Sequence, residues 1–277
     1  MGLVVNNNPA SDSSAQHLAR INEALKKSSA KLSSGSRIPT AAADAAGLAI
    51  SGRLQAQVSA LGQSSRNAYD GVSAVETAEG SLGQVSDILG RLKELSVQAG
   101  NGTLSDADRE TLQNEANDLL KQIDQVAGSS DFNGVNLLDG SVSSLEINVG
   151  AGTEPGIDSL HINLEAVTAG SLGLSTFDIG PGGDRGAALA ALDQSIGTVN
   201  QARARLGATQ NRLYSAIENT QQQITSLTEA DSRIRDVDVA KESSQLVQLQ
   251  IQSQAATAIH AQARLQPQAA LSLLAFK

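Results

Sequence analysis

Apolar residues recur along this chain at alternating steps of four and three positions, over two long stretches without proline. The five prolines stand at positions 9, 39, 155, 181 and 267, so residues 40–154 and 182–266 contain none. An interior proline costs a helix roughly 3 kcal/mol, so these stretches are where long helices can form. Alternating steps of four and three mark the seam of a coiled coil. The pattern therefore predicts long helices packed side by side.

The first stretch divides into two predicted helices. The first helix spans about 45–99, and the glycines of Gly100-Asn101-Gly102 end it. The second follows Ser105 and Asp108, which resemble a capping box, and runs to a stop at Gly128. Because their connection is short, the two helices are expected to be antiparallel neighbours. The seam of the first helix has eight members: Leu54, Val58, Leu61, Ala68, Val72, Val75, Leu82 and Leu89.

The second stretch carries the longest seam, which predicts a third helix from Leu189 to Ile234. Three seams of one kind favour a three-helix bundle. Before this helix, apolar residues alternate with polar ones at 145–149 and again at 160–164, which predicts a β-hairpin at about 143–165. Residues 165–183 are small, polar and rich in glycine, and they predict no regular element.

The two ends of the chain differ from the middle. From Ser243 to Phe276 the only formally charged residue is Arg264, and a helix this neutral on all sides is expected to be buried. Residues 12–34 carry Leu18, Ile21, Leu25 and Leu32 at helical spacing and are its natural partner. Two helices alone leave much apolar surface exposed, so the ends predict an oligomer.

The fold class expected from these patterns is mainly α. It is a long antiparallel coiled-coil helical bundle with one β-hairpin and with the N- and C-termini paired. Two domains are expected. Residues 1–42 with 236–277 form a terminal coiled coil, and residues 43–235 form the three-helix bundle with its hairpin.

Composition and charge narrow the classes of function. The net charge is −9, with +3 on residues 1–40 and +2 on residues 241–277, which leaves −14 for the middle. A chain this acidic argues against nucleic acid as a partner, because phosphate binding needs a basic surface. No run of about 18 apolar residues is present to span a membrane. The first eight residues do not form a cleavable signal peptide, although an export route that leaves the N-terminus intact stays open.

The sequence contains no pattern that favours catalysis. It has no cysteine, no HExxH, no P-loop and no GxSxG, and His17, His161 and His260 stand far apart. We therefore expect no catalytic residue, no cofactor and no metal ion, and we interpret the chain as a structural protein and not an enzyme.

Six motifs, in order, resemble bacterial flagellin. They cover most of the chain, at about 1–165 and 184–274. The matching segments are 32–38 (LSSGSRI), 44–50 (DAAGLAI), 65–71 (SRNAYDG), 132–138 (FNGVNLL), 206–212 (LGATQNR) and 267–274 (PQAALSLL). Only about 165–183 stands where larger flagellins carry variable outer domains, so the resemblance implies a minimal form.

This resemblance implies a structural subunit that polymerises into the hollow helical flagellar filament for swimming motility. The terminal helices would form the inner, filament-core domain, and the bundle with its hairpin the next shell. The protein would be secreted unfolded through the flagellar type III channel and would reside in the extracellular filament. The residues expected to assemble the filament core are Leu18, Ile21, Leu25, Leu32, Leu246, Leu249, Leu271, Leu273 and Leu274.

The resemblance also implies partners. These are further copies of the chain, the flagellar cap, hook-associated junction proteins and a secretion chaperone that holds the C-terminal segment. In some flagellins an animal Toll-like innate immune receptor recognises the bundle, and the matching residues here are Arg91, Leu95 and Glu115. Gly90 departs from the longer polar residue common at its position.

Two alternatives remain open at this point. A hook–filament junction protein would make short oligomers that do not extend, and the motifs at 132–138 and 271–274 favour flagellin over it. Some flagellins carry a protease in the variable region, but here that region is short and lacks HExxH.

Overall fold

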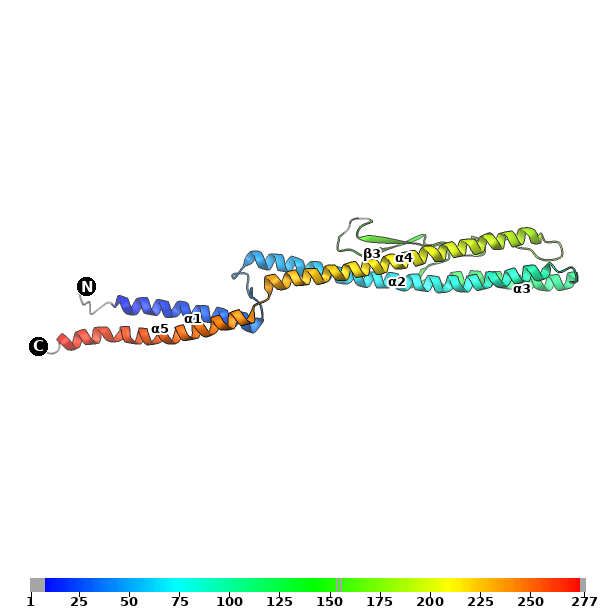
Figure 1. The fold of residues 1–277 in the computed structure, drawn as a ribbon. Helices are drawn as coiled ribbons and strands as arrows, with labels where there is room; N and C mark the ends of the chain where they lie inside the picture. The colour runs from blue at the N-terminus through cyan, green and yellow to red at the C-terminus, as the bar shows by residue number, and fades with distance from the viewer. Residues whose placement is uncertain (1–7, 153, 155, 275–277) are drawn as a thin grey trace. The chain divides into compact units, whose positions relative to one another are not determined.

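The computed structural model of the chain describes residues 8–152, 154 and 156–274, and the side chains of 266–274 lie outside this description. The elements in chain order are α1 (Pro9–Ser34), α2 (Ala45–Ala99), α3 (Asp106–Ser129), β1 (Asp131–Phe132), β2 (Val135–Asn136), β3 (Ser144–Asn148), β4 (Ser159–Asn163), α4 (Arg185–Arg235) and α5 (Val239–Leu274) (Figure 1). The mainly α fold class is thus confirmed.

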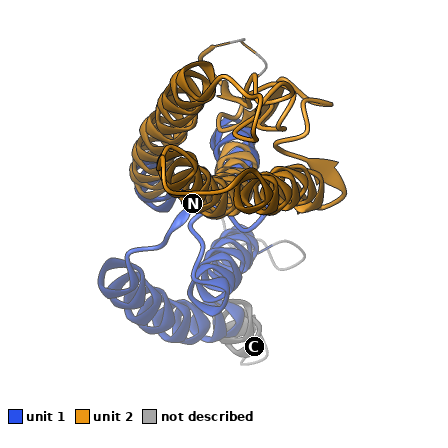
Figure 2. Ribbon diagram, turned by 90° about the vertical axis from the view of Figure 1, so that its right-hand side faces the viewer, with its two compact units in different colours: residues 1–56, 226–277 blue, residues 57–225 orange. Residues whose placement is uncertain are grey.

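The chain folds into two compact units. Residues 1–56 with 226–277 form one unit, and residues 57–225 form the other (Figure 2). The helices α2 and α4 each contribute to both units. The domain division expected from the sequence, at 42/43 and 235/236, stays a prediction.

The helices begin and end where local chemistry satisfies their free backbone groups. The side chain of Asn8 accepts a hydrogen bond from the Ser11 amide at 3.1 Å and caps α1, and Pro9 occupies the first turn. The same helix ends at Gly35, whose φ of 66° suits a residue without Cβ. Helix α3 begins with the expected capping box, in which Ser105 and Asp108 each accept the other's backbone N–H.

In the unit of residues 57–225, α2, α3 and α4 pack around one hydrophobic core. Most of the α2 seam is buried there, but the buried face of α2 is wider than the seam. Ala78, Val85, Leu92 and Ala99 are buried as well, at 0% exposure each. One helix that packs against more than one neighbour needs a broader apolar face than a two-stranded seam does. The spacing of four and three residues therefore predicts the helix correctly but identifies only about half of its buried apolar residues.

The β-hairpin forms as expected and packs against α2. Strands β3 and β4 pair antiparallel, with Leu145 opposite Ile162 and Ile147 opposite Leu160. Ile147 lies against Gly71, where an added Cβ would stand 3.1 Å from its Cγ1 atom. Nearer the start of α2, the hydroxyl of Ser64 donates to the Gly150 carbonyl at 2.5 Å. Burial of one face stabilises a hairpin that would be marginal alone.

Two features of the middle segment were not expected. Strands β1 and β2 form a two-residue ladder, closed by Asn133 and Gly134 with φ of 51° and 80°. Residues 164–179 have no regular element, yet six of their buried apolar side chains belong to the core cluster. These are Leu164, Val167, Leu172, Leu174, Phe177 and Ile179. Their spacing fits neither a helix nor a strand, so periodicity did not reveal them.

In the other unit, α1 and α5 lie side by side and antiparallel (Figure 1). The amide of Asn8 donates to the Ala263 carbonyl at 2.8 Å, near the start of α1. Lys31, near the end of α1, lies 3.7 Å from Glu242, near the start of α5. The pairing of the terminal helices is confirmed.

Candidate functional site: the uncovered face of the terminal helices

Helix α5 presents large apolar side chains that nothing in the described chain covers. Five of the ten exposed large hydrophobic residues of the described chain lie on this helix. They are Val239, Val247, Ile251, Ile259 and Leu265, with exposures from 52% to 63%. Val247, Ile251 and Ile259 stand four and eight residues apart, so they share one face of the helix. Val247, Ile251 and Ile259 thus form an exposed apolar stripe, and such a stripe marks a surface suited to contact with a partner.

Contact between α1 and α5 covers little apolar surface. Among the described residues of this unit, the buried hydrophobic side chains are Ile21, Ile38, Ala256 and Ala263. Two of these four are alanines, which remove little surface from water when buried. The buried set also includes the polar Ser28 and Glu242. The unit therefore lacks a core comparable with that of residues 57–225.

Polar contacts fix how α1 aligns with α5. The Ser14 hydroxyl lies 2.9 Å from Nδ1 of His260, and the Ser253 hydroxyl donates to the side-chain oxygen of Asn22 at 3.2 Å. The Ser14 hydroxyl also lies 2.8 Å from the Ser11 carbonyl one turn earlier in α1. Each such bond contributes only about 0.5–1.5 kcal/mol net, so these contacts specify register more than stability.

The residues expected to assemble the filament core fall into three groups. Ile21 is buried, at 6% exposure. A larger group is half-buried: Leu18, Leu25, Leu32, Leu246 and Leu249. The side chains of Leu271, Leu273 and Leu274 lie outside the described residues. The role of all nine in assembly stays a prediction. Ile251 and Ile259 are not among these nine residues, although they are more exposed than the half-buried leucines and lie in the same neutral segment, 243–276.

The three residues of the expected immune-receptor patch do not share one surface. Arg91 and Glu115 meet between α2 and α3 at 2.8 Å, and Arg91 also contacts Glu94 at 3.0 Å. The hydrogen bonds that Arg91 donates, first to Glu115 and then to Glu94, raise the pKa of Arg91. Leu95 is completely buried in the bundle core. The exposed part of the patch is thus an ion pair, whereas Leu95 belongs to the bundle core.

The histidines and carboxylates of the described chain form no metal cluster. No three His, Asp or Glu side chains in that part of the chain come close enough to hold an ion. His17 and His161 are exposed, and His260 is half-buried beside Ser14. The described helices also include none that is long and apolar enough to cross a membrane.

Long paired helices, a sparse interface and an uncovered apolar stripe define a structural subunit that assembles with other chains. Comparison with known proteins identifies the family to which this subunit belongs. The family model for the bacterial flagellin N-terminal helical region matches residues 5–143, and that for the C-terminal helical region matches residues 189–274. The chain belongs to the bacterial flagellin family and is a structural subunit of the flagellar filament.

Curated relatives match the chain over nearly its whole length. A flagellin of Halalkalibacterium halodurans is 39% identical over 275 residues, which cover 98% of this chain and 100% of that protein. A flagellin of Bacillus subtilis is 38% identical, with 98% and 99% covered. Among solved structures, one assigned as a flagellar hook-associated protein of Vibrio parahaemolyticus shares the fold. It has a TM-score of 0.54 and 18% identity, and the match covers 65% of this chain and 94% of that one.

Proposed function

We propose that this chain polymerises into the hollow helical filament through the α1–α5 pair, which forms the inner wall of the tube. The uncovered stripe on α5 carries this proposal. Full burial of a Val, Leu or Ile side chain contributes roughly 1.5–3 kcal/mol. The five exposed residues of α5 are more than half uncovered, so covering them yields about 5 kcal/mol before the costs of association. Neighbouring copies supply the missing cover.

Seeded assembly tests this proposal. Purified chain is added to filament fragments, with and without residues 243–277, and elongation is followed by electron microscopy. Long hollow filaments from the full chain alone support the proposal. Rings or short rods that stop growing favour the junction-protein alternative.

Point variants locate the contact more sharply. Ile251→Lys and Ile259→Lys place a charge in the stripe and are expected to stop elongation. The control is Ile157→Lys, because Ile157 is 76% exposed but lies in the hairpin loop of the other unit. If the control blocks assembly as strongly as the stripe variants do, the stripe is not the determining surface.

We also propose that the chain leaves the cell unfolded through the flagellar type III channel and functions in the extracellular filament. The sparse α1–α5 interface supports this, because a unit held mainly by polar contacts unfolds easily. A secretion chaperone would cover α5 before export, and the cap and hook-associated proteins would meet the chain at the filament ends. Co-purification of the chaperone from cytoplasm with the full chain, and not with the chain lacking 243–277, is the expected result.

The exposed Arg91–Glu115 pair favours a second function, recognition by an animal Toll-like innate immune receptor. An ion pair held across two helices presents a fixed charge pattern at the surface. Arg91→Ala is expected to lower signalling in receptor reporter cells while the helix content stays unchanged. Lys121→Ala is the control, since Lys121 also forms an exposed ion pair in this unit, with Asp118. Equal signalling from both variants would remove the role of Arg91.

A further inference from the structure

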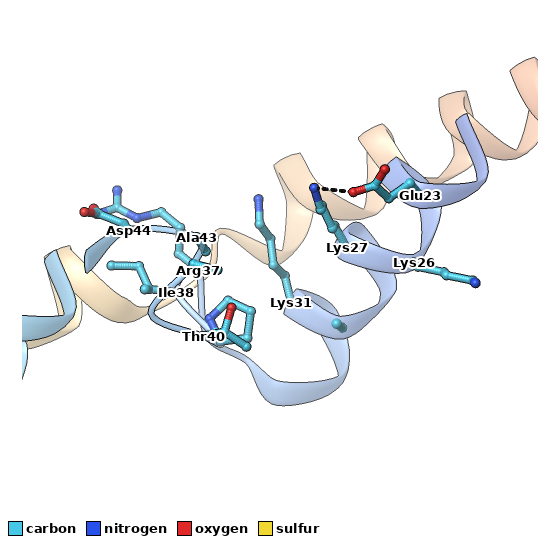
Figure 3. A pocket seen from close by; sticks show the side chains of 12 residues that line it. Glu23, Lys26, Lys27, Lys31, Arg37, Ile38, Thr40, Ala43 and Asp44 are labelled. Carbon is cyan, nitrogen blue, oxygen red and sulfur yellow. Dashed lines mark ion pairs between the residues drawn. The ribbon is translucent and has the colours of Figure 1, made fainter. Parts of the chain in front are cut away.

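A groove of about 730 Å³ opens between α1 and residues 37–44, within the unit of the terminal helices (Figure 3). Its volume is in the range of sites that accept ligands, roughly 300–1,000 Å³. The apolar part of its lining comes from Ala30, Ile38, Pro39, Ala42 and Ala43. Four cations and two carboxylates line it as well: Lys26, Lys27, Lys31, Arg37, Glu23 and Asp44. An apolar patch with a charged rim is the anatomy of a protein interface.

Two cations of the groove are free to take a further carboxylate. Lys27 pairs with Glu23 at 2.8 Å, but both side chains are more than 60% exposed, so this pair contributes little and can exchange partners. The ammonium group of Lys31 lies 3.7 Å from the Glu242 carboxylate. Because an ammonium group has three N–H donors, this one contact leaves donors for a further carboxylate. Lys27 and Lys31 stand four residues apart, and their ammonium groups point the same way in Figure 3. The side chain of Lys26 points away from both.

An occupant that matches this pair of cations carries two carboxylates one helical turn apart. Along the described helices, one pair of acidic residues four positions apart has both members exposed: Asp106 and Glu110, at the start of α3. No ion pair to either residue is found among the described residues. Exposed Ala107 lies beside them and suits the apolar lining of the groove.

We propose that this groove binds the Asp106–Glu110 face of α3 from a second copy of the chain. This proposal rests on the proposed filament function, and it identifies one salt-sensitive contact between neighbouring subunits of the filament. Residues 41–240 carry a net charge of −14 and the first forty residues carry +3, so attraction between copies guides this approach.

A charge exchange tests the pairing. Lys27→Glu and Glu110→Lys each place like charges together and are expected to slow seeded elongation about tenfold at low salt. The chain with both changes restores opposite charges and is expected to recover to near the wild-type rate. Arg20→Glu is the matched control, because it makes the same charge change on the same helix at an exposed residue that does not line the groove. A doubly changed chain as slow as the single variants, or a control as slow as Lys27→Glu, overturns the proposal.

Engineered cysteines give a readout that does not need filaments. The natural chain contains no cysteine, so Lys27→Cys in one copy and Glu110→Cys in another give each copy a single thiol. Oxidation can join two like copies or two unlike copies, and a size tag on one variant separates the two homodimers from the mixed 27–110 dimer. Air oxidation of the mixture is expected to yield this dimer at least fivefold above a mixture with Lys121→Cys in place of Glu110→Cys. If the dimer forms but wild-type chain never elongates, the filament function fails and the groove contact stands. If wild-type chain elongates and the dimer stays at the control level, the groove contact alone is overturned.

Discussion

Helix-interior glycines of α2 offer a quantitative test of the bundle. Gly80 and Gly90 are exposed, and a Cβ built on either meets no atom within 4 Å. Neither has the positive φ that would require glycine. In a helix interior, glycine is less favourable than alanine by roughly 0.5–1 kcal/mol, through the larger entropy of the unfolded chain. Gly80→Ala with Gly90→Ala is therefore expected to stabilise the monomer by about 1–2 kcal/mol.

Thermal unfolding followed by circular dichroism measures this change. For a unit of this size, about 1 kcal/mol shifts Tm by roughly 2–4 °C, so the double variant should melt about 2–8 °C higher. The contrast is Gly71→Ala, whose Cβ would stand 3.1 Å from Cγ1 of Ile147, so the hairpin must shift and little or no gain is expected. A double variant that melts at or below the wild-type temperature would refute the reasoning. A stabilised variant that assembles more slowly would show that neighbouring copies use the space at these glycines.

Three further predictions concern the unit of residues 57–225. Leu95→Ala should destabilise the monomer by about 2–5 kcal/mol in denaturant unfolding, because Leu95 is completely buried, whereas an exposed receptor contact would cost almost nothing. Ser195→Ala should cost about 1–3 kcal/mol and speed amide exchange in residues 168–177, because the buried Ser195 hydroxyl links the Leu172 carbonyl, at 2.8 Å, to α4, where the Ala191 carbonyl lies at 2.7 Å; unchanged exchange would contradict this. Hydrogen bonds donated by the Ser105 side chain and backbone lower the pKa of Asp108 in the folded chain. The Asp108 carboxylate therefore stabilises the fold above the pKa that it has in the unfolded chain, and this stabilisation is lost as the pH falls through its lower pKa in the folded chain. The Tm gap between wild type and Asp108→Asn should thus close below about pH 4, and a gap independent of pH would contradict the capping role.

The two units differ in how many large apolar side chains they bury. The unit of residues 57–225 buries many large apolar side chains, among them Leu82, Leu89 and Leu92 completely. In the described part of the other unit, the large apolar side chains that are buried are Ile21 and Ile38. A unit with so few buried apolar groups gains little to offset the entropy lost on ordering. We therefore expect neighbouring chains to complete the terminal unit, as proposed above for the filament.

The sequence by itself determined the local and periodic features of this protein. Steps of four and three residues located α2, α3 and α4, because a helix repeats its faces regularly and an apolar seam records that repeat. Ser105 and Asp108 identified the start of α3, since capping depends on neighbours three residues apart. The neutrality of residues 243–276 indicated a helix that needs partners, because a charge in such a surface would be costly to desolvate.

Only the tertiary structure decided which residues meet across the chain. It placed Leu95 in the bundle core and left the Arg91–Glu115 pair exposed, because packing between helices, and not spacing along one helix, sets exposure. It also placed the irregular residues 164–179 over the core and opened the groove beside Lys27 and Lys31. Such contacts join segments far apart in sequence, and no local period records them.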